Sequence, residues 1–211
     1  MNQTASLTST RRPRLLLVGA AGTIGRAVAA ELSPRYEVIT AGRTSGDIVI
    51  DMGEEASIRA GLARAGTLDA IVSTAGNVHF GPLAEMTPAQ WQVGLQSKLM
   101  GQVTLAMIGA GHLRDGGSIT LSAGSLAEQP VRGGSSASLV NGALESFVRA
   151  AAIELPRGLR INVVSPSVLQ ESMPDYGPYF RGYEAVPAAR VALAYGRSVE
   201  GAQTGQVYKV L

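Results

Sequence analysis

A glycine-rich turn near the start of the chain constrains its fold more than any other feature. The turn spans residues 19–25, follows the apolar run at 15–18 and leads into a helical pattern at 26–32. In a strand–turn–helix unit, glycines let the backbone approach a pyrophosphate, and N–H groups at the helix start point at the anion. The sequence therefore predicts a dinucleotide-binding unit, with an ordinary strand-to-helix connection as the alternative. The predicted contacts are Gly19, Ala21, Gly22, Thr23, Ile24 and Gly25.

Apolar runs alternate with helical patterns along the rest of the chain. Strands are predicted at residues 15–18, 36–41, 47–51, 68–73, 118–122, 159–165 and 206–211. Helices are predicted at residues 23–32, 54–64, 88–109, 136–155 and 187–195. This alternation predicts an α/β fold with a doubly wound parallel sheet in three layers. We expect a single domain over residues 14–211, preceded by a polar, disordered leader at residues 1–13.

The composition excludes several kinds of site and partner. The chain has no cysteine, which rules out disulfides, thiol catalysis and zinc–thiolate sites. Its two histidines, His79 and His112, stand far apart in the sequence, and we expect no metal. The net charge of +2 is dispersed, so no nucleic-acid partner is expected. Because no apolar run is long enough to span a membrane and the leader lacks the apolar core of a signal peptide, we expect a cytoplasmic protein.

Six motifs, in this order, resemble those of the short-chain dehydrogenase/reductase family. Residues 19–25 resemble its GxxGxxG turn, 73–76 its NNAG element, and 117–122 the strand that ends in its catalytic serine. Residues 144–155 resemble the end of its active-site helix, 160–166 its R-x-N-x-x-x-P-G element, and 205–207 its last strand. The resemblance implies a Rossmann-like domain that transfers hydride between a nicotinamide cofactor and a carbonyl/alcohol pair of a small molecule.

The chain departs from the family's pattern at the Tyr-x-x-x-Lys pair of the active site. Counting back from residues 144–147 places the tyrosine position at Ala137 and the lysine position at Asn141. Alanine has no proton to move, and a neutral asparagine can hydrogen-bond a ribose but cannot lower a pKa by charge. Three interpretations stay open: an oxidoreductase with an atypical active site, a catalytically inactive, non-redox sensor or scaffold that binds NADP, or a non-redox enzyme that uses the cavity for another reaction.

Two residues are predicted to carry the chemistry of such an atypical site. Lys98 stands three residues before Gly101, where the family often has asparagine on the wall of the same cavity. A lysine there would restore a positive charge near the ribose, and partial burial would lower its pKa from about 10.4. A solvated helix lysine is the alternative. Ser122 is predicted to polarise a substrate carbonyl, with Ser125, or a turn serine without catalytic function, as the alternatives.

The residues after the second strand favour NADP over NAD. No acidic residue stands there to bind a ribose 2′-hydroxyl, whereas Arg43 and Thr44 suit a 2′-phosphate; a surface arginine in a turn is the alternative. Asp51 and Met52 resemble the family's adenine-binding element, although Asp51 is also placed to cap the helix near residue 54. The resemblance implies further cofactor contacts from Ala75, Gly76, Lys98, Asn141, Pro166 and Val168.

Residues 167–186 hold four aromatic side chains in a chain with only 5% aromatic residues. This concentration indicates a lid or an oligomer contact, with core packing of a loop as the alternative, and a lid tyrosine is a further candidate for the proton donor. In the family, helices corresponding to residues 88–109 and 136–155 pair across a two-fold axis. We therefore expect a homodimer or homotetramer.

Overall fold

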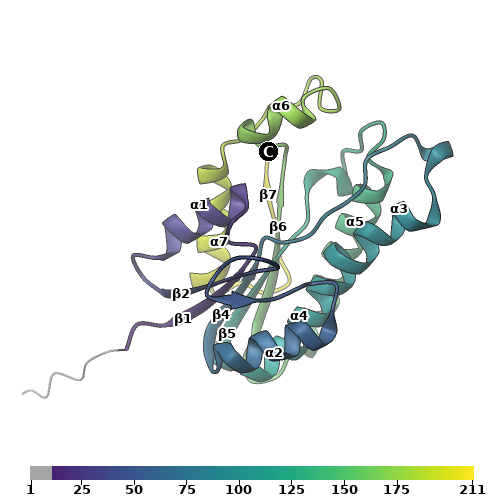
Figure 1. Cartoon of the computed structure of the whole chain (residues 1–211). Helices are drawn as coiled ribbons and strands as arrows, with labels where there is room; N and C mark the ends of the chain where they lie inside the picture. The colour runs from purple at the N-terminus through teal and green to yellow at the C-terminus, as the bar shows by residue number, and fades with distance from the viewer. Residues whose placement is uncertain (1–10) are drawn as a thin grey trace, which may run out of the picture.

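The computed structural model describes residues 11–211, so most of the predicted leader lies outside the described residues. Seven parallel strands form one sheet in the order β3-β2-β1-β4-β5-β6-β7 (Figure 1). The chain winds outward from β1 in one direction and from β4 in the other. Loops on either side of this switch point diverge, which is where ligands bind in open sheets of this class. The strands are β1 (Arg14–Val18), β2 (Glu37–Gly42), β3 (Ile48–Val49), β4 (Leu68–Ser73), β5 (Leu113–Ser122), β6 (Arg160–Pro166) and β7 (Val207–Val210).

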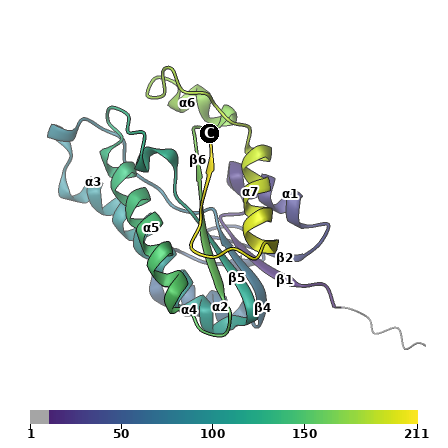
Figure 2. The same ribbon diagram turned by 180° about the vertical axis from the view of Figure 1, so that it is seen from behind.

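Helices cover both faces of the sheet, which confirms the predicted three-layer, doubly wound α/β architecture (Figures 1 and 2). On one face lie α1 (Thr23–Leu32) and α7 (Ala188–Glu200). The other face is covered by α2 (Glu55–Ala65), α4 (Gly101–Gly109) and α5 (Ser135–Glu154). Shorter elements are α3 (Pro88–Val93), α6 (Met173–Tyr176), the π-helical η2 (Gly94–Met100) and the 3-10 turns η1 (Leu83–Glu85), η3 (Ala110–His112), η4 (Ser125–Ala127) and η5 (Gln170–Ser172). Across the described part of the chain, every helix is too short or too polar to cross a lipid bilayer.

Strand β1 shows why the strands read as unbroken apolar runs. Leu15 and Leu17 pack into the cluster beneath α1 and α7, whereas Leu16 and Val18 pack into the cluster beneath α2, α4 and α5. All four side chains are fully buried. A parallel sheet covered on both faces favours apolar side chains on both faces of each strand, and not only at alternate positions.

Several predicted boundaries differ from those observed, for identifiable reasons. Strand β5 begins at Leu113 and not at 118, because buried Leu113 pairs with Leu68 ahead of a register shift, and Gly116 takes a φ of 74°. Helix α7 continues to Glu200 and not to 195, because its buried positions recur up to Val199. The predicted third strand shrinks to two residues.

The predicted helix at 88–109 is a continuous helical run with a π-helical centre. Thr87 starts it with a capping box: its hydroxyl accepts a hydrogen bond from Gln90 N, and the Gln90 side chain accepts one from Thr87 N. Pro88 follows at the first helical position, where a missing N–H costs nothing. The run then widens to the π-helical η2, which carries Lys98, before α4 continues it.

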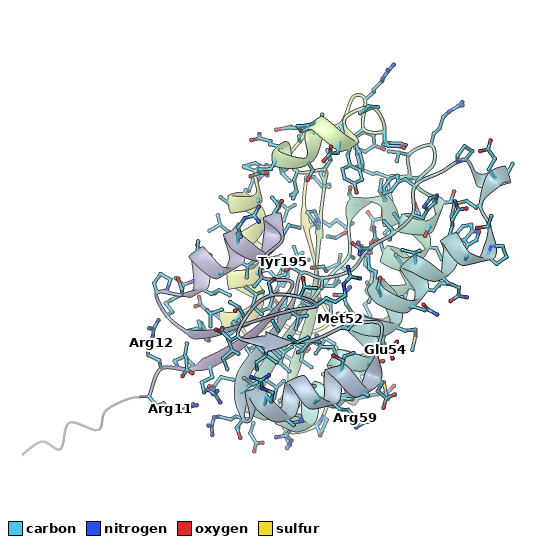
Figure 3. All side chains as sticks on the ribbon, viewed as in Figure 1. Arg11, Arg12, Met52, Glu54, Arg59 and Tyr195 are labelled. Atoms are coloured by element: carbon cyan, nitrogen blue, oxygen red, sulfur yellow. The ribbon has the colours of Figure 1, made fainter. Side chains whose placement is uncertain are left out.

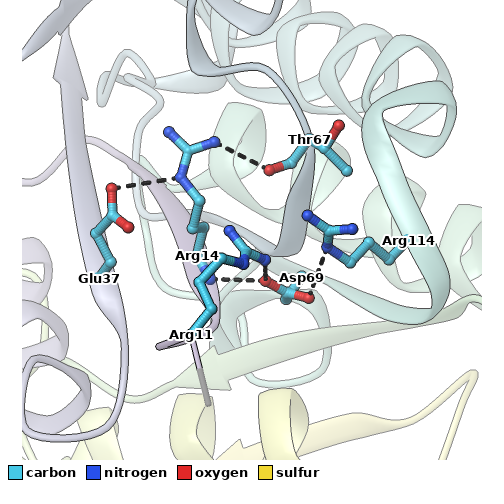
Figure 4. A network of polar contacts seen from close by, with 6 residues as sticks. All are labelled: Arg11, Arg14, Glu37, Thr67, Asp69 and Arg114. Atoms are coloured by element: carbon cyan, nitrogen blue, oxygen red, sulfur yellow. Dashed lines mark hydrogen bonds and ion pairs between the residues drawn. The ribbon is translucent and has the colours of Figure 1, made fainter. Parts of the chain in front are cut away.

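Asp69 holds the amino-terminal ends of three strands together (Figure 4). Its carboxylate accepts a hydrogen bond from Arg14 N at 2.7 Å and forms ion pairs with Arg11 at 3.1 Å and Arg114 at 3.3 Å. Arg14 in turn donates to Thr67 O. Residue 11, which falls within the predicted leader, therefore lies against the domain.

Tyr195 is the largest fully buried side chain of the described residues, and it points from α7 into the sheet (Figure 3). Its hydroxyl is hydrogen-bonded to Ser122 Oγ, which itself donates to Ser73 O at 2.7 Å. Because Ser122 donates its hydroxyl proton to Ser73 O, the Tyr195 hydroxyl must be the donor in its hydrogen bond with Ser122 Oγ. Burial raises the pKa of Tyr195 well above its usual value, so the hydroxyl stays protonated.

Removal of this hydroxyl tests whether it stabilises the fold. We expect Tyr195→Phe to lower the free energy of unfolding by about 1 kcal/mol, the usual net value of one buried hydrogen bond. Tyr195→Leu should cost more, because it also leaves a cavity. Urea denaturation followed by circular dichroism measures both. Equal stability of Tyr195→Phe and the parent would contradict the assignment.

Candidate functional site

Two cavities meet at the carboxyl ends of the strands, on either side of the loop that follows β4. The first has a volume of about 340 Å³ and lies beyond the ends of β1 and β2. The second, of about 260 Å³, lies between α5, η2 and the segment after β6. Gly76 and Asn77 line both, so the two cavities join into one cleft across the switch point of the sheet. The predicted residues that line the first cavity are Gly19, Ala21, Gly22, Arg43, Thr44, Asp51, Met52, Ala75 and Gly76. Those that line the second are Ile24, Gly76, Lys98, Asn141, Pro166 and Val168.

The glycine turn is packed too tightly to admit side chains. Gly19 has a φ of 89°, and a Cβ there would lie 2.8 Å from Ala75 N. A Cβ on Gly25 would lie 2.1 Å from Gly19 O, so Gly25 shapes the turn without lining either cavity. Thr23 also lies outside the linings of both cavities. Gly22 precedes α1 without a side-chain cap, which leaves N–H groups of the first turn free for an anion.

Arg43 and Thr44 lie exposed on the outer wall of the first cavity. Arg43 forms no ion pair with another residue of the described part of the chain. Asp51 also lines this cavity, but its Oδ1 already accepts a hydrogen bond from Gly53 N at 2.9 Å. Glu54, and not Asp51, is the N-cap of α2, so Asp51 shapes the turn that leads to the helix.

Lys98 brings a positive charge into the second cavity. Its side chain is largely buried, and Nζ donates a hydrogen bond to Ala123 O at 3.3 Å. It pairs with no carboxylate among residues 11–211, and burial lowers its pKa to about 8. Gly76 makes room for the lysine stem, because a Cβ there would lie 2.8 Å from Lys98 Cβ and Cγ. Lys98 is thus partly buried on the cavity wall, in agreement with the expected partial burial and not with a solvated helix lysine.

On the facing wall, Ala137 and Asn141 come from successive turns of α5. Asn141 is only 2% exposed, and its Oδ1 is buried without a hydrogen-bond partner among the described residues. A Cβ on Gly124 would lie 3.0 Å from Asn141 Nδ2, so the glycine keeps the space beside the amide open. A buried amide oxygen without a donor costs about 1–3 kcal/mol, which a bound donor would offset.

Ser122 lies outside both cavities, and this corrects the expectation that its hydroxyl faces a substrate. Side chains alternate along β5, and Thr120 and Ser122 point toward α7, where they bond Ser198 and Tyr195. Ser125, the alternative, does line the second cavity. The period-two alternation along β5 indicates from the sequence that Ser122 shares a face with Thr120, but it does not indicate which face of the sheet that is.

The segment after β6 forms one wall of the second cavity. Ser172, Tyr176 and Phe180 line it, which supports the lid interpretation of residues 167–186. Tyr176 is 39% exposed, and its ring packs edge-on against Phe80 with centroids 5.5 Å apart. Of the lid tyrosines, Tyr176 alone lines this cavity. Phe80 and Gly124 are wall residues that sequence reasoning missed, because neither carries a reactive group.

Comparisons with known proteins agree with this architecture. Residues 19–211 match the family model described as enoyl-(acyl carrier protein) reductase. Versicolorin reductase 1 of Aspergillus parasiticus is 31% identical over 115 residues, which cover 51% of this chain and 42% of that protein. Versicolorin reductase stcU of Emericella nidulans is 27% identical over 188 residues, which cover 75% of this chain and 69% of that protein. The match to versicolorin reductase 1 therefore spans less than half of that relative's length.

Solved structures share the fold over nearly the whole chain. The protein lin1944 from Listeria innocua is 48% identical, with a TM-score of 0.93 and coverage of 94% of this chain and 100% of that one. A small-chain dehydrogenase crystallised with NADPH is 25% identical, with a TM-score of 0.85 and coverage of 95% and 97%. Because the family model covers most of the residues, the chain belongs to that family, a branch of the short-chain dehydrogenase/reductase oxidoreductases.

Proposed function

We propose that the protein binds NADP(H) in the joined cavities and interconverts a carbonyl and an alcohol through an atypical active site. The observation that carries this proposal is the presence of two polar groups in the second cavity: the Lys98 ammonium, which pairs with no carboxylate of residues 11–211, and the buried Asn141 Oδ1, which has no hydrogen-bond partner among them. By the count back from residues 144–147, Ala137 and Asn141 would occupy the positions of the family's tyrosine and lysine. Lys98 supplies the charge that Asn141 lacks.

The residues of the cleft fit such a cofactor. The glycine turn leaves backbone N–H groups open for a pyrophosphate, and Arg43 with Thr44 suits a 2′-phosphate. Asn141 Oδ1 can accept a hydrogen bond from a ribose hydroxyl. The related small-chain dehydrogenase crystallised with NADPH supports the choice of cofactor. When bound, NADPH supplies hydride to a carbonyl carbon, and NADP⁺ accepts it in the reverse direction.

Lys98 is the proposed proton donor. With a pKa of about 8, its Nζ is mostly protonated at neutral pH yet releases a proton more readily than an exposed lysine does. The ammonium would polarise the carbonyl oxygen and then transfer a proton to the nascent alkoxide. Ala137 leaves space for the substrate, and Tyr176, which lines the same cavity, is a second candidate donor.

A second candidate function is binding of NADP without turnover, as a sensor or scaffold. It is favoured by Ala137, which has no proton to give, and by Ser122, whose hydroxyl is used inside the sheet. Titration of the protein with NADPH, followed by an NADPH-oxidation screen over aldehydes, ketones and quinones, separates the candidates. Tight binding without turnover would support the sensor, and failure to bind NADPH would refute both.

Association into a homodimer or homotetramer is also part of the proposal, and the cytoplasmic location stays a prediction. Helices α4 and α5 expose large apolar side chains, namely Met107 (68%), Leu139 (50%) and Ile153 (87%). We expect light scattering to give a mass that is a multiple of 21.8 kDa, and Ile153→Glu to shift it toward the monomer. A parent protein that is monomeric at micromolar concentration would contradict the proposal.

Arg43 tests the choice of cofactor. The parent should bind NADPH more tightly than NADH, and Arg43→Ala should remove about 1.5–3 kcal/mol of that preference, the value of a hydrogen bond to a charged group. Fluorescence titration measures the four dissociation constants. Arg64→Ala, on the exposed face of α2, is the control for loss of a positive charge. Equal affinities of the parent for NADPH and NADH would refute the prediction.

Lys98→Met tests the proton donor. We expect reductase activity of the parent to fall as pH rises through about 8, because the deprotonated amine can no longer give a proton. The variant should lose most of its activity or cofactor affinity, and any residual rate should lack this pH limb. Steady-state rates between pH 6 and 10 check this. Unchanged rates and unchanged NADPH affinity would remove Lys98 from the mechanism.

The same variant has a predictable effect on stability. Burial disfavours the charged form of Lys98, so its pKa is lower in the folded than in the unfolded chain. The unfolded chain therefore binds more protons between pH 8 and about 10.5, and this group makes folding more favourable as pH rises through that window. Lys98→Met should be more stable than the parent at pH 7, and the difference should shrink above pH 8. Urea denaturation at pH 7 and at a pH above 8 measures the free energy of unfolding of both proteins.

A further inference from the structure

A third cavity, of about 870 Å³, lies beside the second and has no part in the function proposed above. Its walls come from three separate segments: the loop after β4, the loop before α5 and the segment after α6. In Figure 1 these segments face one another at the carboxyl end of the sheet. The lining residues are Gly81, Pro82, Leu83, Pro130, Val131, Arg132, Gly133, Ser135, Pro178, Tyr179, Arg181 and Tyr183.

A small aromatic cluster forms the wall between the second and third cavities. Phe80 and Tyr176 line the second, and Tyr179 lines the third. The Phe80 ring packs against both tyrosines, with centroid separations of 5.5 Å to Tyr176 and 5.2 Å to Tyr179. Because the two cavities share this wall, an elongated molecule that lies over its outer edge would contact residues of both cavities.

The third cavity is positively charged without compensation. Arg132 and Arg181 come from different segments, and no aspartate or glutamate of residues 11–211 lines the cavity. Neither arginine forms an ion pair with another residue in the range 11–211. Ser135 begins the 20-residue helix α5, whose first turn holds no acidic residue and has no side-chain cap. The helix dipole therefore adds to the positive potential of the two guanidinium groups.

We propose that the third cavity binds the anionic end, a carboxylate or a phosphate, of an elongated substrate whose carbonyl group reacts in the second cavity. Arginine pairs with both kinds of anion through parallel hydrogen bonds. Prolines, Leu83 and Val131 offer apolar surface for the middle of such a molecule, and the volume lies within the usual range for ligand sites. The assignment of the substrate class rests on the proposed function, whereas anion binding in this cavity can be measured independently.

Three probes of equal chain length separate charge from apolar contact: octanoate, octyl phosphate and octanamide. Titration calorimetry on the full-length protein, with and without saturating NADPH, measures their affinities. We expect at least one anion to bind about tenfold or more tightly than octanamide, and its affinity to fall with added salt, since both arginines are exposed. The tighter of the two anions identifies the natural terminal group. Equal affinity of all three probes would overturn the proposal.

Substitution of the arginines locates the effect. Arg132→Gln and Arg181→Gln should each weaken binding of the preferred anion about tenfold, while octanamide and NADPH affinities stay unchanged. Arg64→Gln removes the same charge from the exposed surface of α2 and should change nothing. An equal loss in Arg64→Gln, or unchanged anion affinity in both cavity variants, would refute the assignment. If the parent protein does not bind NADPH, the proposed function is refuted, but the measurement of anion binding in the third cavity stays valid.

Discussion

The packing of the glycine turn against the loop after β4 is the contact on which the cleft depends. Gly19 N donates to Ala41 O at 2.8 Å, Thr74 N donates to Val18 O at 2.8 Å, and Thr74 Oγ1 donates to Gly19 O at 3.1 Å. These bonds join the ends of β1, β2 and β4 at the switch point of the sheet. A side chain at Gly19 would separate them, and the start of α1 would then move away from the space where a pyrophosphate fits.

Lys98 shows how a charge can be held inside such a cleft at a cost to folding. The ammonium has a single backbone carbonyl as partner within the described structure, and its burial lowers the pKa. Such a group is tolerated only where the surroundings fix it, and here η2 and Gly76 do so. Single π-helical turns are frequent at functional sites, since they re-aim side chains that a regular helix would direct elsewhere.

The fold could be predicted from the sequence because its signals are local. Alternating apolar runs and helical patterns are set by short stretches of chain, and the glycine turn carries its own constraint. Site residues in loops that follow a strand, such as Gly22, Arg43 and Gly76, could be predicted from their position. Lys98 and Asn141 lie on helices and could be predicted only by counting from the motifs that resemble the family's. Ser122 was misplaced because a strand end offers side chains to opposite faces, and residue type alone does not say which face a serine takes. The cavity around Arg132 and Arg181 is formed by three loops that lie far apart in the sequence, so no local sequence pattern predicts it.

The positive charges of the cleft are distributed so that each could serve a different step of the proposed function. Arg43 lies at one end of the cleft, Lys98 at its centre, and Arg132 with Arg181 beyond the aromatic wall. In sequence these cations are dispersed, and the net charge of +2 conceals them. In space each of them lines one of three neighbouring cavities at the carboxyl edge of the sheet. A cofactor phosphate, a nascent alkoxide and a terminal anion of the substrate would each meet a separate cation, so binding at one end would not neutralise the charge that the reaction requires.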